Sequence, residues 1–442
     1  MNNTIVALAT APMNSAIHII RVSGPKTYDI VNSITDIKIV KKHYSVQKVK
    51  IIDDKKIIDH VLMIKFVAPR SFTGEDTIEI NCHGGLFLAS IIIKLLIKHG
   101  CELAKPGEFS QRAFMNNKLT LLEAESINNL IHAPNATAVQ IANNAINSPT
   151  HQTLTIFKKT LFTLIGQIEI NIDYPEYNDV PQITPIQFEK IISNLIQQIK
   201  SIVIHSKQAT LYHQGINVAI VGEPNAGKSS LLNAFIHEPR AIVSSAPGTT
   251  RDVISERVNI NELTLNFLDT AGIRHSRESV EKMGIQKTMQ AIDKSELVLY
   301  VIDASKASKK TNKNILNNLN NKKYLIVLNK TDLPIKTSIK GIKVSAKHGK
   351  ISNLINAISK QIRKLDLSDS ELVILQSERA IALLEQVHNN LLQIEHLMKK
   401  HEPVDLSMEL LHQCLVNIQN ILGENKTENF YDELFKNFCV GK

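Results

Sequence analysis

The chain has 442 residues, 43% of them hydrophobic, and Lys and Arg together exceed Asp and Glu by nine. This length predicts two to four domains. The lack of a long apolar run or a signal-like start argues against a membrane span and secretion. Four scattered cysteines predict reduced thiols in a cytoplasmic protein. The positive charge suits a polyanionic partner such as RNA, although an AT-rich genome explains it equally well.

Residues 1–118 mix short β-type runs with one helix. Strands are predicted at residues 17–24, 46–52 and 61–67, and the polar cluster at 53–56 suits a hairpin turn between the last two. A helix is predicted over residues 86–99, with a glycine just past its end. These elements together indicate a small α+β domain.

Two later blocks, residues 119–212 and 369–442, show helical periodicity, because their apolar positions recur every three or four residues. Between them, residues 213–368 alternate strands with helices. The strands are predicted at residues 216–221, 253–260, 263–269, 296–303, 324–329 and 341–345. Such alternation indicates a mostly parallel sheet covered by helices.

The predicted architecture is therefore multidomain, with α/β and all-α parts. We expect an N-terminal α+β domain of residues 1–118 and a central helical bundle built from residues 119–212 and 369–442. An α/β domain of residues 213–368 is inserted into that bundle. Three independent domains in a row are the alternative, but neither helical block is amphipathic enough to stand alone.

A phosphate-binding motif, GEPNAGKS, follows the first strand of the α/β segment and opens a helix. Its glycines let backbone N–H groups turn toward phosphates. The Lys228 ammonium supplies a catalytic positive charge at the β- and γ-oxygens, and the Ser229 hydroxyl can bind Mg²⁺. This P-loop predicts nucleotide contacts from Asn225, Ala226, Gly227, Lys228, Ser229 and Ser230.

Two further motifs predict that the base is guanine. In NKTD, the Asp332 carboxylate can accept from guanine N1–H and from the exocyclic amine, a pair of donors that adenine does not offer. Backbone groups of the later SAK tripeptide lie where they can donate to guanine O6. The expected GTP contacts are Asn329, Lys330, Asp332, Ser345, Ala346 and Lys347. A P-loop ATPase with chance NKTD and SAK tripeptides is the alternative.

The γ-phosphate side is predicted from the DTAG motif, which ends the third strand. Asp269 can hold the Mg²⁺ shell and Gly272 can sense the γ-phosphate, so GTP contacts are expected at Asp269, Thr270, Ala271 and Gly272. The motif PGTTRD lies where a switch loop belongs. Its Thr250 is placed to complete the Mg²⁺ shell only in the triphosphate state.

The water-activating group is not obvious from the residues. Ras-like enzymes use a glutamine after DTAG, but this chain has Ile273 there. Glu278 and Glu281 are both within reach of a second switch, and sequence physics alone does not choose between them. Arg251 could supply the transition-state cation, although a solvated charge is the simpler interpretation of that residue.

Polar residues surround glycines in three N-terminal loops, SFTGED, CHGG and KPGEFSQR. Combined with NKL, the TTRD switch and the C-terminal C-x-G-K, these loops closely resemble the tRNA modification GTPase MnmE (TrmE) family, over essentially the whole chain. The GTPase motifs alone fit many relatives. The N-terminal loops together with that tail are far more selective.

The resemblance implies a homodimer formed through an N-terminal domain that binds a tetrahydrofolate derivative of the 5-formyl or 5,10-methylene type. By motif, the folate-contacting positions are Arg21, Glu79, Lys118 and Lys442. Cys439 corresponds to the tail cysteine of the family, with an inert thiol as its alternative.

The resemblance also implies a GTPase stimulated by potassium. The K⁺-binding positions are Asn225, Ser244, Ala246 and Thr249, of which Ser244 and Thr249 also belong to the expected GTP site. It selects Glu281 as the catalytic residue that orients water. The implied partner is the flavoprotein MnmG (GidA), which brings FAD into a heterotetramer-type complex. Together they install an aminomethyl-type group, commonly carboxymethylaminomethyl, at C5 of the wobble uridine of certain tRNAs.

Two other functions fit parts of the sequence. A GTP-gated assembly factor that binds ribosomal RNA is the runner-up, since many GTPases share the TTRD switch. A scaffold that binds GTP without turnover is the third possibility, but the intact Lys228, Ser229, Thr250 and Asp269 argue against it. Binding of a reduced folate to residues 1–118 distinguishes the first hypothesis from the runner-up.

Overall fold

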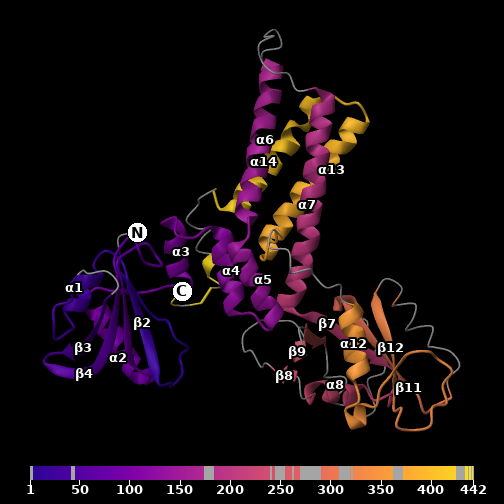
Figure 1. The fold of residues 1–442 in the computed structure, drawn as a ribbon, viewed down its shortest axis with the longest axis horizontal. Helices are drawn as coiled ribbons and strands as arrows, with labels where there is room; N and C mark the ends of the chain where they lie inside the picture. The colour runs from indigo at the N-terminus through magenta and orange to yellow at the C-terminus, as the bar shows by residue number, and fades with distance from the viewer. Residues whose placement is uncertain are drawn as a thin grey trace. The chain divides into compact units, whose positions relative to one another are not determined.

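The computed structural model describes residues 3–40, 45–173, 184–238, 241–243, 254–260, 263–268, 290–307, 319, 322–361, 372–424, 434–436, 438–439 and 441. The chain forms two compact units, which Figure 1 colours by residue number. The first consists of Met1–Asn128, His151–Pro185 and Asn389–Lys442; the second consists of Asn129–Thr150 and Ile186–His388. Both units are therefore assembled from segments that are distant in the sequence.

A six-stranded sheet dominates the N-terminal part of the first unit, in the order β3-β4-β5-β2-β1-β6. Neighbouring strands are antiparallel except β1 and β6, which run parallel. The strands are β1 (Ile5–Leu8), β2 (Ile17–Ser23), β3 (Ser45–Asp53), β4 (Lys56–Phe66), β5 (Thr77–His83) and β6 (Glu102–Leu103). The three predicted strands and the predicted hairpin are confirmed, and Asp54 and Lys55 form its turn with φ of 44° and 70°.

Helices α1 (Thr27–Asn32) and α2 (Leu86–Lys98) pack against this sheet. Their apolar side chains join those of the strands in one core, which includes Ile30, Ile92 and Leu96 from the helices and Val22 and Ile80 from the strands. The opposite faces of β2 and β5 carry Arg21 and Glu79, which are directly paired in the antiparallel register. Helix α3 (Glu108–Met115) follows the sheet in sequence.

Long helices occupy the two segments where helical periodicity was predicted, and their predicted apolar faces are buried at Leu154, Leu161, Phe188, Ile199 and Leu384. The helices are α4 (Leu121–Ile131), α5 (Ala136–Asn147), α6 (Thr150–Asp173), α7 (Pro185–Gln214), α13 (Glu378–Lys399) and α14 (Met408–Leu422), with a short 3-10 turn η2 (Val404–Ser407) before α14.

The second unit contains a seven-stranded sheet in the order β13-β12-β11-β7-β10-β9-β8. The strands are β7 (Ile216–Gly222), β8 (Ala241–Val243), β9 (Ile254–Ile260), β10 (Leu263–Leu268), β11 (Leu297–Asp303), β12 (Lys323–Asn329) and β13 (Ile342–Lys343). The five neighbouring strands from β10 to β13 run parallel, whereas β9 is antiparallel to both β10 and β8. All six predicted strands are confirmed, and β8 was not predicted.

Apolar layers cover both faces of this second sheet. Helices α8 (Lys228–Ile236) and α12 (Ser352–Gln361) contribute Phe235 and Leu354 to the larger core, whereas Ile292 and Leu319 lie in the smaller core on Tyr300. Strand β7 lies between β11 and β10, so the carboxyl ends of three parallel strands meet at one edge. In doubly wound sheets that edge holds the ligand.

Candidate nucleotide site and N-terminal charge cluster

The phosphate-binding loop runs from the end of β7 to the start of α8. Gly227 takes φ of 90°, a conformation that side chains rarely adopt, and a Cβ atom there would lie only 2.2 Å from Asn329 Nδ2. Asn225 also has a positive φ, of 63°. The loop therefore needs glycine at 227 both for its backbone turn and for close packing against the NKTD strand.

Lys228 is the first residue of α8, and its side chain folds back over the loop. Its Nζ donates to the carbonyl oxygens of Gly222 and Glu223, each at 2.9 Å. Burial lowers the pKa of the Lys228 ammonium, and a phosphate beside it would favour the charged form again. Ser229 and Ser230 follow in the first turn, where helix N–H groups point toward an anion.

Asn329 joins the phosphate loop to the base-binding motifs. Its side chain is only 2% exposed. Its Nδ2 donates to the Ala226 carbonyl at 3.0 Å, and its Oδ1 accepts from the Ala346 backbone N–H at 3.1 Å. One amide therefore holds the P-loop, NKTD and SAK together, as the sequence predicted that these motifs share a site.

Asp332 is held by Ser345. The Ser345 hydroxyl donates to Asp332 Oδ1 at 2.6 Å, and this hydrogen bond lowers the pKa of the Asp332 carboxyl. The carboxylate therefore stays ionised near neutral pH and can accept from two N–H donors of a base. Ala346 and Lys347 lie in the 3-10 turn η1 (Ala346–His348), directly after Ser345.

Sequence analysis missed one residue of this site, Asp303. Lys330, which has φ of 63°, places its Nζ 2.6 Å from Asp303 Oδ2. Asp303 ends β11 and is 8% exposed. Burial opposes ionisation of its carboxyl, but hydrogen bonds from Lys330 and Ser305 outweigh burial and lower its pKa. Asp303 could have been found from the sequence, because it is an aspartate at the carboxyl end of a predicted parallel strand.

The remaining predicted nucleotide and ion contacts lie outside the described residues. They are Ser244, Ala246, Thr249, Thr250, Asp269, Thr270, Ala271, Gly272 and Glu281. The alternatives Arg251 and Glu278 also lie outside them, as does Lys442. The described half of the site is thus the phosphate loop and the base side.

In the first unit, Arg21 and Glu79 form an ion pair on adjacent strands. Arg21 donates through Nε and Nη2 to Glu79 Oε1, at 2.9 and 2.8 Å. Among the described residues nothing donates to Glu79 Oε2, so this oxygen remains available as an acceptor. The rings of Phe72 and Phe109 lie 5.9 and 5.7 Å from the Arg21 guanidinium carbon, so the cation also has two aromatic neighbours.

The C-terminal segment reaches this pair. Arg21 Nη1 donates to the Gly441 carbonyl at 2.7 Å, and the Gly107 N–H donates to the Cys439 carbonyl at 3.2 Å. Gly441 has φ of 89°, and a Cβ atom there would lie 2.8 Å from Leu8 O. The half-buried Cys439 is therefore carried on a segment that lies against the N-terminal domain.

Lys118 is exposed and lies along the SFTGED loop, with its Cε 3.2 Å from the position that a Cβ on Gly74 would occupy. Within the described part of the chain it makes no ion pair with Glu79. The structure thus brings together Arg21, Glu79 and the residue before Lys442, while Lys118 stands apart from that contact.

No helix among the described residues is long and apolar enough to cross a membrane. The described residues likewise contain no group of three or more His, Cys, Asp or Glu side chains that could hold a metal ion. A strand, a P-loop and a helix, joined through Asn329 to a guanine-type NKTD motif, show that the second unit contains the G domain of a P-loop GTP-binding protein.

Comparison with known proteins extends this to the whole chain. Residues 4–118 match the family described as the N-terminus of GTP-binding protein TrmE, and residues 121–439 match the MnmE helical domain. The tRNA modification GTPase MnmE of Ureaplasma parvum serovar 3 is 45% identical over 100% of both chains. That of Malacoplasma penetrans is 43% identical, again over 100% of both. The chain therefore belongs to the MnmE (TrmE) family of tRNA modification GTPases.

A solved structure of an Aquifex aeolicus Era variant is 27% identical, with a TM-score of 0.25, and covers 39% of this chain and 65% of its own. The family matches confirm the predicted kind of architecture: an N-terminal α/β domain, a helical domain and an inserted G domain. The three sets of domain boundaries stay a prediction.

Proposed function

We propose that this chain is a potassium-stimulated GTP hydrolase that acts with the flavoprotein MnmG (GidA). Together the two proteins form an aminomethyl-type group, such as carboxymethylaminomethyl, at C5 of the wobble uridine of certain tRNAs. Membership of the tRNA modification GTPase family over the full chain supports this assignment. It also favours this function over a factor that assembles ribosomes.

The observation that carries the proposal is the preformed guanine side of the site. Asn329 fixes both the P-loop and the SAK backbone, and Ser345 orients the ionised Asp332. A guanine base satisfies that carboxylate with its N1–H and exocyclic amine. Adenine would leave the carboxylate without its donors, and a desolvated, unpaired charge is costly.

Hydrolysis needs positive charge near the γ-phosphate. Lys228 supplies one charge, and the donor chemistry of the loop suits two ions. The Ser229 hydroxyl, with Thr250 and Asp269, would hold Mg²⁺, while Asn225, Ser244, Ala246 and Thr249 would hold K⁺. Both ions supply electrostatic stabilisation of the phosphates when bound. Ile273 has no group that could orient water. The family resemblance assigns that role to Glu281.

A tetrahydrofolate derivative fits the N-terminal charge cluster, and such derivatives supply a one-carbon unit. Glu79 Oε2, to which no described residue donates, is an acceptor of the kind that a pterin amine and ring N–H require. Arg21 is already paired with Glu79 and Gly441. We therefore assign Arg21 to holding Glu79 and the tail in place, and Lys118 and Lys442 to the folate carboxylates. We further propose a homodimer, with FAD supplied only through the partner.

Nucleoside mass spectrometry of tRNA tests the function. Cells lacking this gene should lose the modified wobble uridine and regain it with the wild-type gene, but not with an Asp332→Asn variant. An unchanged wobble-uridine profile in the deletion strain would overturn the assignment. Turnover should also fall when potassium is replaced by sodium, and ATP should not replace GTP.

A further inference from the structure

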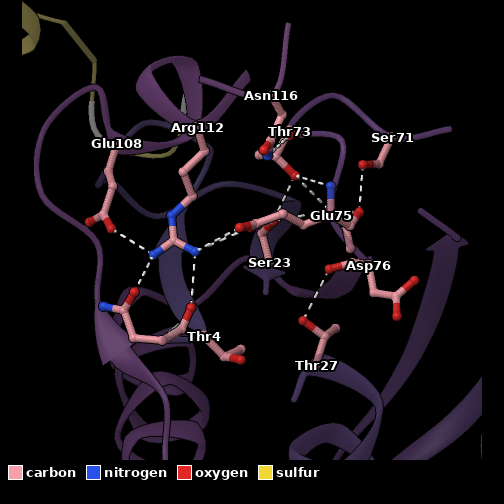
Figure 2. Close-up of polar contacts among 12 residues, drawn as sticks. Thr4, Ser23, Thr27, Ser71, Thr73, Glu75, Asp76, Glu108, Arg112 and Asn116 are labelled. Carbon is pink, nitrogen blue, oxygen red and sulfur yellow. Dashed lines mark hydrogen bonds and ion pairs between the residues drawn. The ribbon is translucent and has the colours of Figure 1, made fainter. Parts of the chain in front are cut away.

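A buried arginine of the PGEFSQR motif ties three segments of the first unit together (Figure 2). Arg112 is 1% exposed. Its Nη1 donates to the Asn3 carbonyl at 3.0 Å and to the two oxygens of the Glu75 carboxylate at 3.2 and 3.1 Å. Its Nη2 donates to Asn3 Oδ1 and to Glu108 Oε1, both at 2.8 Å. The guanidinium thus joins the start of the chain, the SFTGED loop and helix α3.

Each of the two glutamates fixes the segment that carries it. Glu75 Oε2 accepts from the Ser23 hydroxyl at 2.8 Å, and Ser23 also shares a 2.8 Å hydrogen bond with Thr73, as Figure 2 shows. Glu108 Oε2 accepts from the Lys105 N–H at 2.8 Å, which secures the start of α3. The SFTGED loop is thereby bound to β2, and α3 to the chain before it.

These two segments carry the aromatic rings beside Arg21. Phe72 belongs to the SFTGED loop, three residues before Glu75, and Phe109 follows Glu108 directly. Both rings pack in one small core and lie within 6 Å of the Arg21 guanidinium. Ser23, the far end of the Arg112–Glu75 chain, is two residues from Arg21 on β2. The segments that Arg112 holds therefore lie beside Arg21, although no described hydrogen bond joins Arg112 itself to Arg21 or Glu79.

Stability alone is a poor explanation for this network. A guanidinium and two carboxylates lose hydration on burial, and an apolar cluster of similar volume often stabilises a fold as well or better. Within the described ranges the Arg112 Nε has no hydrogen-bond partner, which adds to the cost. Fixed geometry is what such a network provides, because the planar guanidinium sets the directions of its hydrogen bonds.

We propose that Arg112 is the positioning residue of the N-terminal charge cluster. It holds Phe72 and Phe109 against Arg21, so that Arg21 keeps Glu79 aligned through Oε1 and leaves Oε2 available as an acceptor. This inference rests on the proposed folate function, since Glu79 is the acceptor that would meet the pterin.

The test compares two buried cations of the same domain in the full-length chain. Arg112→Lys keeps the charge but loses the planar fork. Lys65→Met is the matched control, because Lys65 is also 1% exposed but bonds to Val40 and Gln47 instead. The chain contains no tryptophan. Phe72→Trp therefore introduces a single tryptophan in the loop as an emission reporter, and folate affinity is measured separately in chains that keep Phe72.

Arg112→Lys should weaken equilibrium binding of 5-formyltetrahydrofolate by about tenfold or more, the usual loss when a positioning partner is removed. Emission from the introduced tryptophan should shift to the red and become easier to quench with acrylamide. Lys65→Met should lower the melting temperature but leave both readouts at their original values. If Arg112→Lys does not fold, Glu75→Gln, which keeps an acceptor for Arg112, should change both readouts in the same direction by less.

Two results in the Arg112 variant, unchanged folate affinity and unchanged tryptophan emission, would together overturn the proposal, whatever its melting temperature. Equal changes in the Lys65 control would do the same, because they would show a general effect of destabilisation. Failure of the unmodified chain to bind the folate would instead refute the folate part of the proposed function. The emission of the tryptophan reporter would then still decide whether Arg112 positions the loop.

Discussion

The base side of the nucleotide site and the N-terminal charge cluster are built in opposite ways. In the G domain one neutral amide, Asn329, holds three loops together, and the Asp332 carboxylate accepts a hydrogen bond from the Ser345 hydroxyl. In the N-terminal domain charges are held by charges, since Arg21 pairs with Glu79 and Arg112 with Glu75 and Glu108. The nucleotide site is suited to distinguish bases by the hydrogen-bond donors that they offer to Asp332. The N-terminal charge cluster fixes geometry through ion pairs whose members come from separate segments.

The largest effect that would sharpen this comparison is expected from Asp332→Asn. The change removes two charge-assisted hydrogen bonds to guanine, so GTP affinity should fall by roughly a hundredfold. Xanthosine triphosphate, which has a carbonyl in place of the amine, should bind the variant better than GTP. Calorimetric titration measures both, with the exposed Asp405→Asn as control. Unchanged GTP affinity would remove Asp332 from the site.

A smaller loss is expected from Gly227→Ala. The added methyl group meets Asn329 Nδ2 at 2.2 Å in a backbone conformation with φ of 90°. Strain of this kind costs about 1–3 kcal/mol, so GTP affinity should fall by roughly tenfold to a hundredfold. Gly166→Ala is the matched control, because nothing lies within 4 Å of its Cβ position. Wild-type GTP affinity in the Gly227 variant would show that the Asn329 side chain can move aside without weakening nucleotide binding.

The N-terminal site should respond to a change far along the chain. Gly441→Ala places a methyl group 2.8 Å from Leu8 O at a positive φ, so the segment should lose its contact with Arg21. Affinity for 5-formyltetrahydrofolate should fall by about tenfold, and GTP affinity should not change. If folate binding is insensitive to this variant, the C-terminal segment is not part of the site.

The smallest expected effect is on the pH dependence of stability, through His213 in the second unit. Burial lowers the pKa of His213, whose Nε2 lies 3.0 Å from the Asn129 carbonyl oxygen. Because the folded-state pKa is below the unfolded value of about 6.5, His213 adds stability at a pH above about 6.5, and that stability is lost as the pH falls. Melting curves measured from neutral to mildly acidic pH should show a weaker acid dependence for His213→Gln. Equal acid dependence in the two proteins would contradict this.

The two sites also differ in how much of them could be predicted. The nucleotide motifs are contiguous stretches at strand ends, so the P-loop, Asn329, Asp332 and Ser345 followed from local sequence. Asp303 was missed because its partner, Lys330, directly follows the neighbouring parallel strand rather than its own.

The N-terminal cluster could be located only through a family resemblance. Arg21 and Glu79 meet through the register of β2 and β5, which periodicity alone does not specify. The role of Arg112 depends on contacts among three separate segments, and its motif does not indicate what Arg112 binds. Local patterns do not predict contacts between segments this far apart in the chain.

The hydrogen bond between Arg21 and Gly441 joins residues 420 positions apart and has a consequence for biosynthesis. The first unit needs the segment from Asn389 onward, whereas every segment of the second unit precedes it. Because domains fold as the ribosome delivers them, the second unit, which carries the nucleotide site, can mature first. Folding of the second unit shortens the flexible stretch of chain between the N-terminal domain and the C-terminal segment. The entropy cost of bringing the C-terminal segment, which is synthesised last, to the N-terminal site is then lower. A nascent chain would therefore acquire nucleotide binding before it acquires the N-terminal site.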